Sequence, residues 1–258
     1  MVASKAWRLY VAHWPELLTA YVFAILLYGL VALVAALITA PLLTGGALVG
    51  KLFLAAVLVG IIWLAVAPLA KGGLYDAVIR AQRGRAPGAG EFWQAGLRYW
   101  GRCLALCVFQ LPLGLLLYLA WSLLARLSPV LGAGFALLLA APVLVVMVGF
   151  VQYVAIAEDC GAGAAISRAV RIVVRRPGDV VMTTAVLAGG TLVLGVVGFF
   201  LGEVPVAGPA LQLFVLLAWA PYGLLYLAVR YESRVAPALS PLGGVAVFHV
   251  NPPPGAGV

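Results

Sequence analysis

The sequence is poor in the residues that catalysis and metal binding require. Its 258 residues include two histidines (His13 and His249), three cysteines and eight acidic residues. Charged residues make up 9% of the chain, whereas a soluble domain has about 25%. A phosphate-binding glycine loop, a nucleophile elbow and a zinc-protease helix motif are all missing from the sequence. We therefore predict a protein that is not an enzyme, with no catalytic residue, no metal site and no cofactor.

The three cysteines leave one metal-binding alternative. Cys103 and Cys107 are one helical turn apart, and with Cys160 and a histidine they could bind zinc. Their spacing differs from the two-residue gap of a zinc knuckle, and two of them begin an apolar run. We favour free thiols in a reducing compartment, packed as small apolar side chains.

Long apolar runs dominate the rest of the chain, which is 65% hydrophobic with a mean hydropathy of +1.14. A helix needs about 20 apolar residues to cross a bilayer, and six runs reach that length: 17–43, 50–70, 103–125, 135–157, 180–202 and 210–230. The predicted fold is an all-α integral membrane protein with six transmembrane helices. Pro15 and Pro209 suit the first turns of spans one and six, and Asp179 is expected to cap span five.

The basic residues are distributed asymmetrically between the two sides of these spans. Positive residues stay on the cytoplasmic side, so both termini are expected in the cytoplasm of a bacterial cell, with the spans in its inner membrane. Only Lys51 and Arg126 fall on the opposite side. Fourteen of the sixteen lie in alternate segments: Lys5, Arg8; Lys71, Arg80, Arg83, Arg85, Arg98, Arg102; Arg168, Arg171, Arg175, Arg176; Arg230, Arg234.

The formal net charge of +8 could indicate a nucleic-acid partner. We reject that interpretation because the basic residues flank runs of membrane length. Each is then worth about 1 kcal/mol against anionic lipid headgroups. The expected partners are the bilayer, its anionic headgroups, and another membrane protein or a second copy of the chain.

Three cytoplasmic segments are predicted to form interfacial amphipathic helices: 4–14, 91–102 and 164–176. Each precedes two spans, which divides the membrane domain (1–231) into units of about 1–70, 86–157 and 162–231. The second and third units share G-A-G, at Gly88 and Gly161, followed at equal spacing by two arginines, so an internal repeat is one interpretation. The candidate lipid or partner contacts are Arg8, Arg98, Arg102, Arg168, Arg171 and Arg175. A Pro/Gly-rich cytoplasmic tail covers 232–258; residues 245–250 could form a short strand, but we favour a mostly disordered tail.

The segment before span five carries a family resemblance. It has VAIAED at 154–159, then Gly161, AAISR at 164–168 and RIV at 171–173. This pattern resembles the membrane domain of glycerophosphodiester phosphodiesterases and its stand-alone bacterial relatives, with weaker support from Gly73, Arg80, Gly84 and Phe92. The resemblance implies the membrane fold alone, because the catalytic barrel of those phosphodiesterases has no counterpart in this chain.

The remaining polar and small residues each have two interpretations. Glu158 and Asp159 could hold an ion, but we favour a cytoplasmic acidic turn with local salt bridges to Arg168 or Arg171. Gln110, Gln152 and Gln212 lie in three spans that prolines interrupt, and they either line a polar cavity or hydrogen-bond across the bundle. In span five, Gly189, Gly198 and Gly202 suit close helix packing within the chain or against a second chain.

These observations favour a non-enzymatic polytopic membrane protein that organises lipid, or a partner membrane protein, through basic interfacial helices. The alternative is a permease, or a permease subunit, for a small or lipidic solute.

Overall fold

The computed structural model describes residues 2–42, 48–85, 88–202 and 207–235, and within these ranges it contains helices and no strand. The candidate strand at 245–250 lies outside the described residues. Three short elements, labelled η, are π-helical. The order is α1 (Val2–Leu42), α2 (Leu48–Gln82), α3 (Ala89–Leu127), α4 (Pro129–Phe135), η1 (Ala136–Ala140), α5 (Ala141–Leu144), η2 (Val145–Phe150), α6 (Val151–Ala157), α7 (Ala162–Arg175), α8 (Pro177–Gly202), α9 (Ala207–Arg230) and η3 (Tyr231–Val235).

Five helical stretches of the described residues are long and apolar enough to cross a membrane: Val2–Thr39, Val57–Gln82, Ala89–Leu127, Pro129–Ala157 and Pro177–Gly198. These correspond to the first five predicted spans. The sixth predicted span corresponds to α9, where the side chains of residues 207–216 lie outside the described part of the chain.

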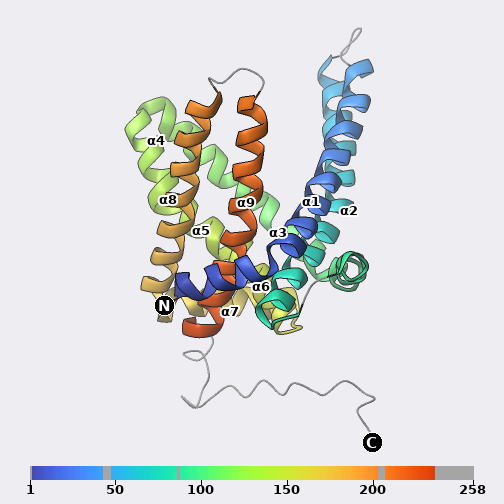
Figure 1. Cartoon of the computed structure of the whole chain (residues 1–258). Helices are drawn as coiled ribbons and strands as arrows, with labels where there is room; N and C mark the ends of the chain where they lie inside the picture. Colours follow the sequence, from blue (N-terminus) through green and yellow to red (C-terminus); the bar gives the residue numbers. More distant parts are fainter. Residues whose placement is uncertain (1, 43–47, 86–87, 203–206, 236–258) are drawn as a thin grey trace, which may run out of the picture.

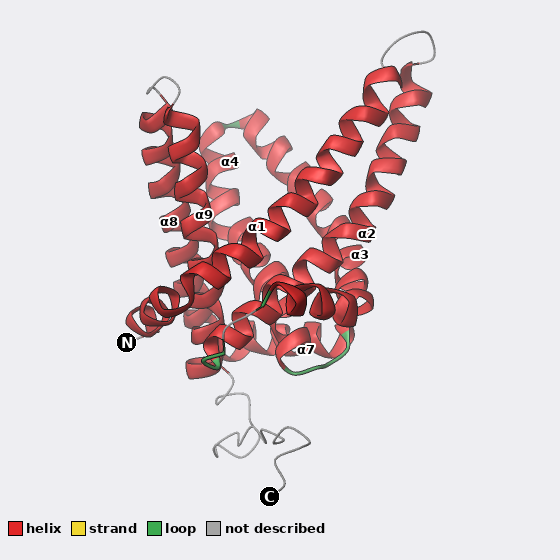
Figure 2. Ribbon diagram, turned by 45° about the vertical axis from the view of Figure 1, so that its right-hand side comes forward, coloured by secondary structure: helices red, strands yellow, loops and turns green. Residues whose placement is uncertain are grey.

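The helices diverge toward one end of the molecule. The N-terminal part of α1, α7 and the end of α9 lie together at the opposite end (Figure 1). From there the α1–α2 hairpin leans away from α8 and α9 in both views (Figure 1, Figure 2). The buried core lies among α2, α3, α6, α7 and α9, with Tyr153, Phe150 and Leu225 fully buried in it.

A kink at His13 divides α1. His13 has non-helical backbone angles (φ −126°, ψ 20°). Pro15 follows directly, and a proline inside a helix removes one N–H donor and clashes with the preceding turn. The break therefore separates the short segment that ends near residue 12 from the span that begins at Pro15. The expected helix start at Pro15 matches this position.

Helix α2 continues beyond the predicted end of span two. The prediction placed Lys71 and Arg80 in a loop, which is wrong because α2 runs as one helix to Gln82. The apolar run stops at Ala70, but buried residues continue at helical spacing at Ala77, Val78 and Ala81. Lys71 therefore lies inside a candidate span.

Close contact between α2 and α3 depends on glycines. A Cβ on Gly96 would lie 2.7 Å from the Leu69 carbonyl oxygen, and one on Gly72 would lie 3.1 Å from the Gly96 Cα. A Cβ on Gly73 would lie 2.6 Å from the Phe92 ring. The two backbones approach this closely because none of the three glycines has a side chain. Helix α3 itself is continuous, so segment 91–102 is not separate from span three.

The G-A-G motifs occupy equivalent places in the structure. Gly88 and Gly161 are the N-cap residues of α3 and α7, both in extended conformation. Both helices bury the residues four, eight and eleven places beyond that glycine: Phe92, Gly96 and Tyr99 in α3, and Ala165, Ala169 and Ile172 in α7. The helices differ at their far ends. Pro177 starts α8 two residues after α7 stops, because proline cannot continue the helix before it.

Candidate functional site

A polar pocket of about 290 Å³ lies between the end of α2, the first turns of α3, and the end of α6 with the turn that follows it. We call it the basic pocket, because four arginines and two aspartates form most of its wall. Asp76 and Arg80 are four residues apart and therefore share one face of α2, and Arg83 and Arg85 follow directly after the end of that helix. The lining residues are Asp76, Ile79, Arg80, Arg83, Arg85, Arg98, Tyr99, Ile156, Ala157 and Asp159.

One side of the basic pocket is fixed by ion pairs. Arg80 donates to Asp76 (Nε–Oδ2, 2.6 Å) and to Glu91 (Nη1–Oε1, 2.9 Å). The other oxygen of Glu91 accepts the N–H of Gly88 at 3.1 Å. One carboxylate therefore caps α3 and also joins it to α2.

The opposite side is formed by Asp159 and the arginines of α3. Asp159 has φ 50°, a left-handed conformation that aspartate adopts more readily than most residues. It accepts a hydrogen bond from Arg102 (Nη1–Oδ1, 2.5 Å), and the Arg98 guanidinium lies 3.8 Å away. Both guanidinium groups also lie over the Tyr99 ring, 5.3 and 5.8 Å from its centroid. Residues separated by a whole helix hairpin thus meet at this turn.

Two arginines of the basic pocket, Arg83 and Arg85, have no carboxylate partner among the described residues. Both residues are exposed. Arginine presents several N–H donors in a planar fork that matches carboxylate and phosphate oxygens. The pocket is therefore suited to an anion with several oxygens.

The acidic turn lies between α6 and α7, as predicted, and its two residues point to different partners. Glu158 pairs with Arg168 and accepts the Tyr231 hydroxyl hydrogen bond at 2.5 Å. Burial, together with this bond, raises the pKa of Tyr231 above its ordinary value. The predicted local salt bridge is therefore present for Arg168, while Asp159 turns instead toward α3.

A related contact ties the end of the chain to α2 and α6. The Tyr153 hydroxyl lies 2.9 Å from Gln82 Oε1 and 2.8 Å from Glu232 Oε1. A phenol has a single hydrogen, so it can donate to one of these oxygens at a time. Glu232 belongs to the predicted tail but contacts the membrane domain.

Two of the three glutamines meet inside the bundle. Gln110 of α3 donates to the Met147 carbonyl oxygen at 2.6 Å, and Gln152 of α6 lies 3.5 Å from Gln110 Oε1. The same oxygen accepts a 3.0 Å hydrogen bond from Lys71. Gln152 is fully buried, and its Oε1 has no partner among the described residues. The side chain of Gln212 lies outside the described part of the chain.

The other predicted contact residues are exposed. Arg8, Arg171 and Arg175 make no ion pair with any described residue. Arg171 and Arg175 lie on α7 beside exposed apolar side chains, of which Val174 is 74% exposed. This combination suits contact with a bilayer surface or a partner more than contact with water.

Among the described residues of α8, the glycine closest to a neighbouring helix is Gly190, which is not one of the three predicted packing glycines. A Cβ on Gly189 would meet nothing within 4 Å, whereas one on Gly190 would fall 2.0 Å from the Trp219 ring of α9. Gly198 is partly exposed, and the side-chain surroundings of Gly202 lie outside the described residues. Close packing within the chain is therefore not seen at Gly189, and for Gly198 and Gly202 it stays a prediction.

No group of three histidine, cysteine or acidic residues within the described ranges could hold a metal ion. Cys103 and Cys107 are fully buried free thiols, and Cys160 is partly exposed. Burial, followed by the charge of Glu158, raises the pKa of the Cys160 thiol.

We expect a maleimide to modify Cys160 alone among the three cysteines of the folded protein. Because its pKa is raised, its labelling rate should keep rising with pH above the range where a free thiol levels off. Mass spectrometry of peptides labelled between pH 7 and 10 measures this. A membrane-impermeant maleimide should reach Cys160 in inside-out vesicles and not in intact spheroplasts, with Cys160→Ser as the control. Labelling of Cys103 before unfolding, or of Cys160 from outside, would contradict the packing or the orientation.

Sequence reasoning missed three residues of these sites as functional candidates. Arg83 and Arg85 were counted as topology signals, and Lys71 was assigned to a loop. The four-residue spacing of Asp76 and Arg80, continued by Arg83, was the available signal that a helix carries these charges beyond the apolar run.

The described chain is thus an all-helical protein with the features of an integral membrane protein: five stretches that can span a bilayer and a basic pocket at one end. Comparison with known protein families, with curated proteins and with solved structures finds no match for it. The resemblance to the membrane domain of glycerophosphodiester phosphodiesterases stays a prediction from the sequence.

Proposed function

We propose that this protein is a non-enzymatic membrane protein that binds anionic lipid of the cytoplasmic leaflet and organises it around the basic pocket. The observation that supports this most directly is that Arg83 and Arg85 line that pocket without an ion-pair partner among the described residues. Arg80 and Arg98 complete the wall, but carboxylates already neutralise part of their charge. A lipid phosphate at the pocket mouth supplies the missing negative charge.

The proposed topology has six spans, with both termini in the cytoplasm. The start of α1 and the end of α9 lie at the same end of the molecule, as Figure 1 shows. An even number of crossings is needed to return the chain to its starting side, so α9 serves as the sixth span. Arg126, in the last turn of α3, then faces the opposite side.

The segment before the kink at His13 and helix α7 serve as interfacial elements in this proposal. Trp7 and Val11 in that segment, and Trp14 directly after the kink, are each about half exposed, although their side chains are large and apolar or aromatic. Tryptophan is enriched at the level of the lipid headgroups. Arg171 and Arg175 on α7 add positive charge at the same end of the molecule, where anionic headgroups are most concentrated.

A second candidate function is a permease, or a permease subunit, for a small or lipidic solute. The observation that favours it is the cluster of Lys71, Gln110 and Gln152 within the bundle, in which Gln152 Oε1 is left unpaired. Polar groups at membrane depth often mark a solute pathway. Uptake into proteoliposomes distinguishes this function from simple lipid binding.

Lipid binding can be tested with matched arginine variants. Arg83→Gln should weaken binding of phosphatidylglycerol about fivefold, because each basic group near the membrane surface contributes about 1 kcal/mol. Arg126→Gln removes the same charge at the opposite end and should leave binding unchanged. Native mass spectrometry of the protein titrated with phosphatidylglycerol in neutral detergent measures both. Equal weakening by the two variants, or by neither, would refute the assignment of the pocket.

A further inference from the structure

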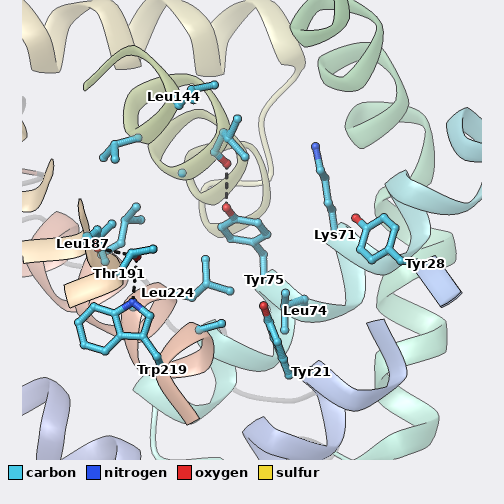
Figure 3. A pocket seen from close by; sticks show the side chains of 16 residues that line it. Tyr21, Tyr28, Lys71, Leu74, Tyr75, Leu144, Leu187, Thr191, Trp219 and Leu224 are labelled. Carbon is cyan, nitrogen blue, oxygen red and sulfur yellow. Dashed lines mark hydrogen bonds between the residues drawn. The ribbon is translucent and has the colours of Figure 1, made fainter. Parts of the chain in front are cut away.

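An apolar cleft of about 460 Å³ lies between the α1–α2 hairpin and α8–α9. Its volume falls within the range of about 300–1,000 Å³ typical of small-molecule sites. Residues of η2 and α5, including Leu144 and Val148, line it between the two hairpins. Figure 3 shows Lys71 and Tyr28 on one side of the cleft, and Trp219 and Leu187 on the other.

The cleft contains a single cationic group among its lining residues. The Lys71 ammonium donates to Gln110 Oε1 at 3.0 Å and to Cys107 Sγ at 3.5 Å. Both partners are neutral, and no described carboxylate forms an ion pair with Lys71. An ammonium group has three hydrogens, so one donor stays available to a ligand.

Lys71 lies inside the candidate span Val57–Gln82, although the predicted apolar run stops one residue before it. It precedes the end of α2 at Gln82 by about 16 Å, at 1.5 Å of rise per residue. A lysine inside a span is costly unless a polar partner or an anion compensates its charge. Gln110 compensates part of it, and Gln110 is held in place by its own hydrogen bond to the Met147 carbonyl.

The rest of the cleft suits a hydrocarbon chain. Leu187, Leu224 and Leu227 provide aliphatic walls, and Trp219 forms a flat aromatic one. The polar groups on that side are already satisfied: the Trp219 N–H donates to Thr191, whose hydroxyl donates to the Leu187 carbonyl. Negative charge is therefore favoured at one end of the cleft and apolar bulk at the other.

We infer that this cleft binds a single-chain fatty acid, with its carboxylate at Lys71 and its acyl chain toward Trp219. A carboxylate carries one negative charge, which matches one ammonium group, and it is small enough to sit at membrane depth. The hydroxyl of Tyr28, which makes no hydrogen bond to a described residue, is available as a second donor on the same side of the cleft. This inference is independent of lipid binding at the basic pocket.

Photolabelling tests the inference on the full chain in nanodiscs of neutral phosphatidylcholine. The probe is a long-chain fatty acid with a mid-chain diazirine. Labelled peptides should map to the cleft walls in α8 and α9. Lys71→Met should reduce this labelling about tenfold, because a hydrogen bond to a charged group is lost. Lys71→Arg, which keeps the charge, should retain most of it.

Two further measurements separate ligand loss from misfolding. Ala220→Phe fills the cleft while leaving Lys71 intact, and it should also reduce labelling. Unlabelled oleate should compete with the probe, whereas oleyl alcohol, which lacks the charge, should not. Arg83→Gln should not change the labelling, so this result stands apart from the test of the basic pocket.

The inference fails if Lys71→Met, with an unchanged melting temperature, is labelled as strongly as the wild type. It also fails if oleyl alcohol competes as well as oleate. Labels found mainly on exposed lipid-facing residues such as Leu115 would likewise show that the probe reports the bilayer and not the cleft.

Discussion

Gly96→Ala should destabilise the protein by about 1–3 kcal/mol, the usual cost of forcing extra atoms into a packed contact. The new methyl group would lie 2.7 Å from the Leu69 carbonyl oxygen. Backbone cannot rotate away as a side chain can, so α2 and α3 must separate. The separation would also weaken the contact between Arg80 of α2 and Glu91 of α3. Thermal unfolding in detergent, followed by size-exclusion chromatography, measures the loss.

Gly101→Ala is the matched control in the same helix. A Cβ on Gly101 would meet no atom within 4 Å. Alanine is favoured over glycine in a helix interior by about 0.8–1 kcal/mol, so this variant should be slightly more stable than the wild type. The two substitutions are chemically identical and are expected to have opposite signs. If both shift stability in the same direction, the close approach of α2 and α3 is not as described.

Arg230→Met should cost about 3–5 kcal/mol, the expected loss when one partner of a buried ion pair is removed. Arg230 donates to Asp179 at 2.7 Å, and the two side chains are only 12% and 16% exposed. It also donates to the Tyr226 hydroxyl at 2.9 Å. The variant would leave the Asp179 carboxylate with little access to water and no cation to balance it. Unfolding free energy in a denaturing-detergent titration measures the effect.

The double variant Arg230→Met/Asp179→Leu removes the unbalanced charge and should recover much of the loss. Arg98→Gln is the exposed comparison, because Arg98 and Asp159 are 67% and 54% exposed. Pairs this accessible contribute about 0–1 kcal/mol. A large effect from Arg98→Gln, or no recovery in the double variant, would contradict this distribution of electrostatic stability.

The sequence predicted the spans through one physical quantity, the length of apolar segments. The described helices match the first five runs because lipid exposure demands continuous apolar surface. The length of the apolar run also led to the wrong assignment of Lys71 to a loop, because a helix that packs against neighbouring helices can continue past the point where its hydropathy falls. Helical spacing of the buried residues after Ala70 contained that information.

The sites were less predictable because they depend on residues far apart in the chain. The acidic turn could be assigned an ion pair with Arg168, ten residues away, because local geometry limits the choice. The approach of Arg102 to Asp159 depends on how two hairpins pack. Asp179, expected as a helix cap, instead lies in the first turn of α8 and pairs with Arg230 from the other end of the hairpin. Sequence periodicity identifies which face of a helix is buried but not which helix covers it.

The contact between Gly190 and Trp219 has an evolutionary consequence. Gly190 does not line the cleft, yet a side chain larger than hydrogen at that position would displace the Trp219 ring, which does. A single codon change at Gly190 would therefore alter the width of the cleft, while every lining residue, Lys71 included, stayed the same. If the cleft binds a fatty acid as inferred, selection at Gly190 would change the preferred acyl-chain length without any substitution in the cleft wall.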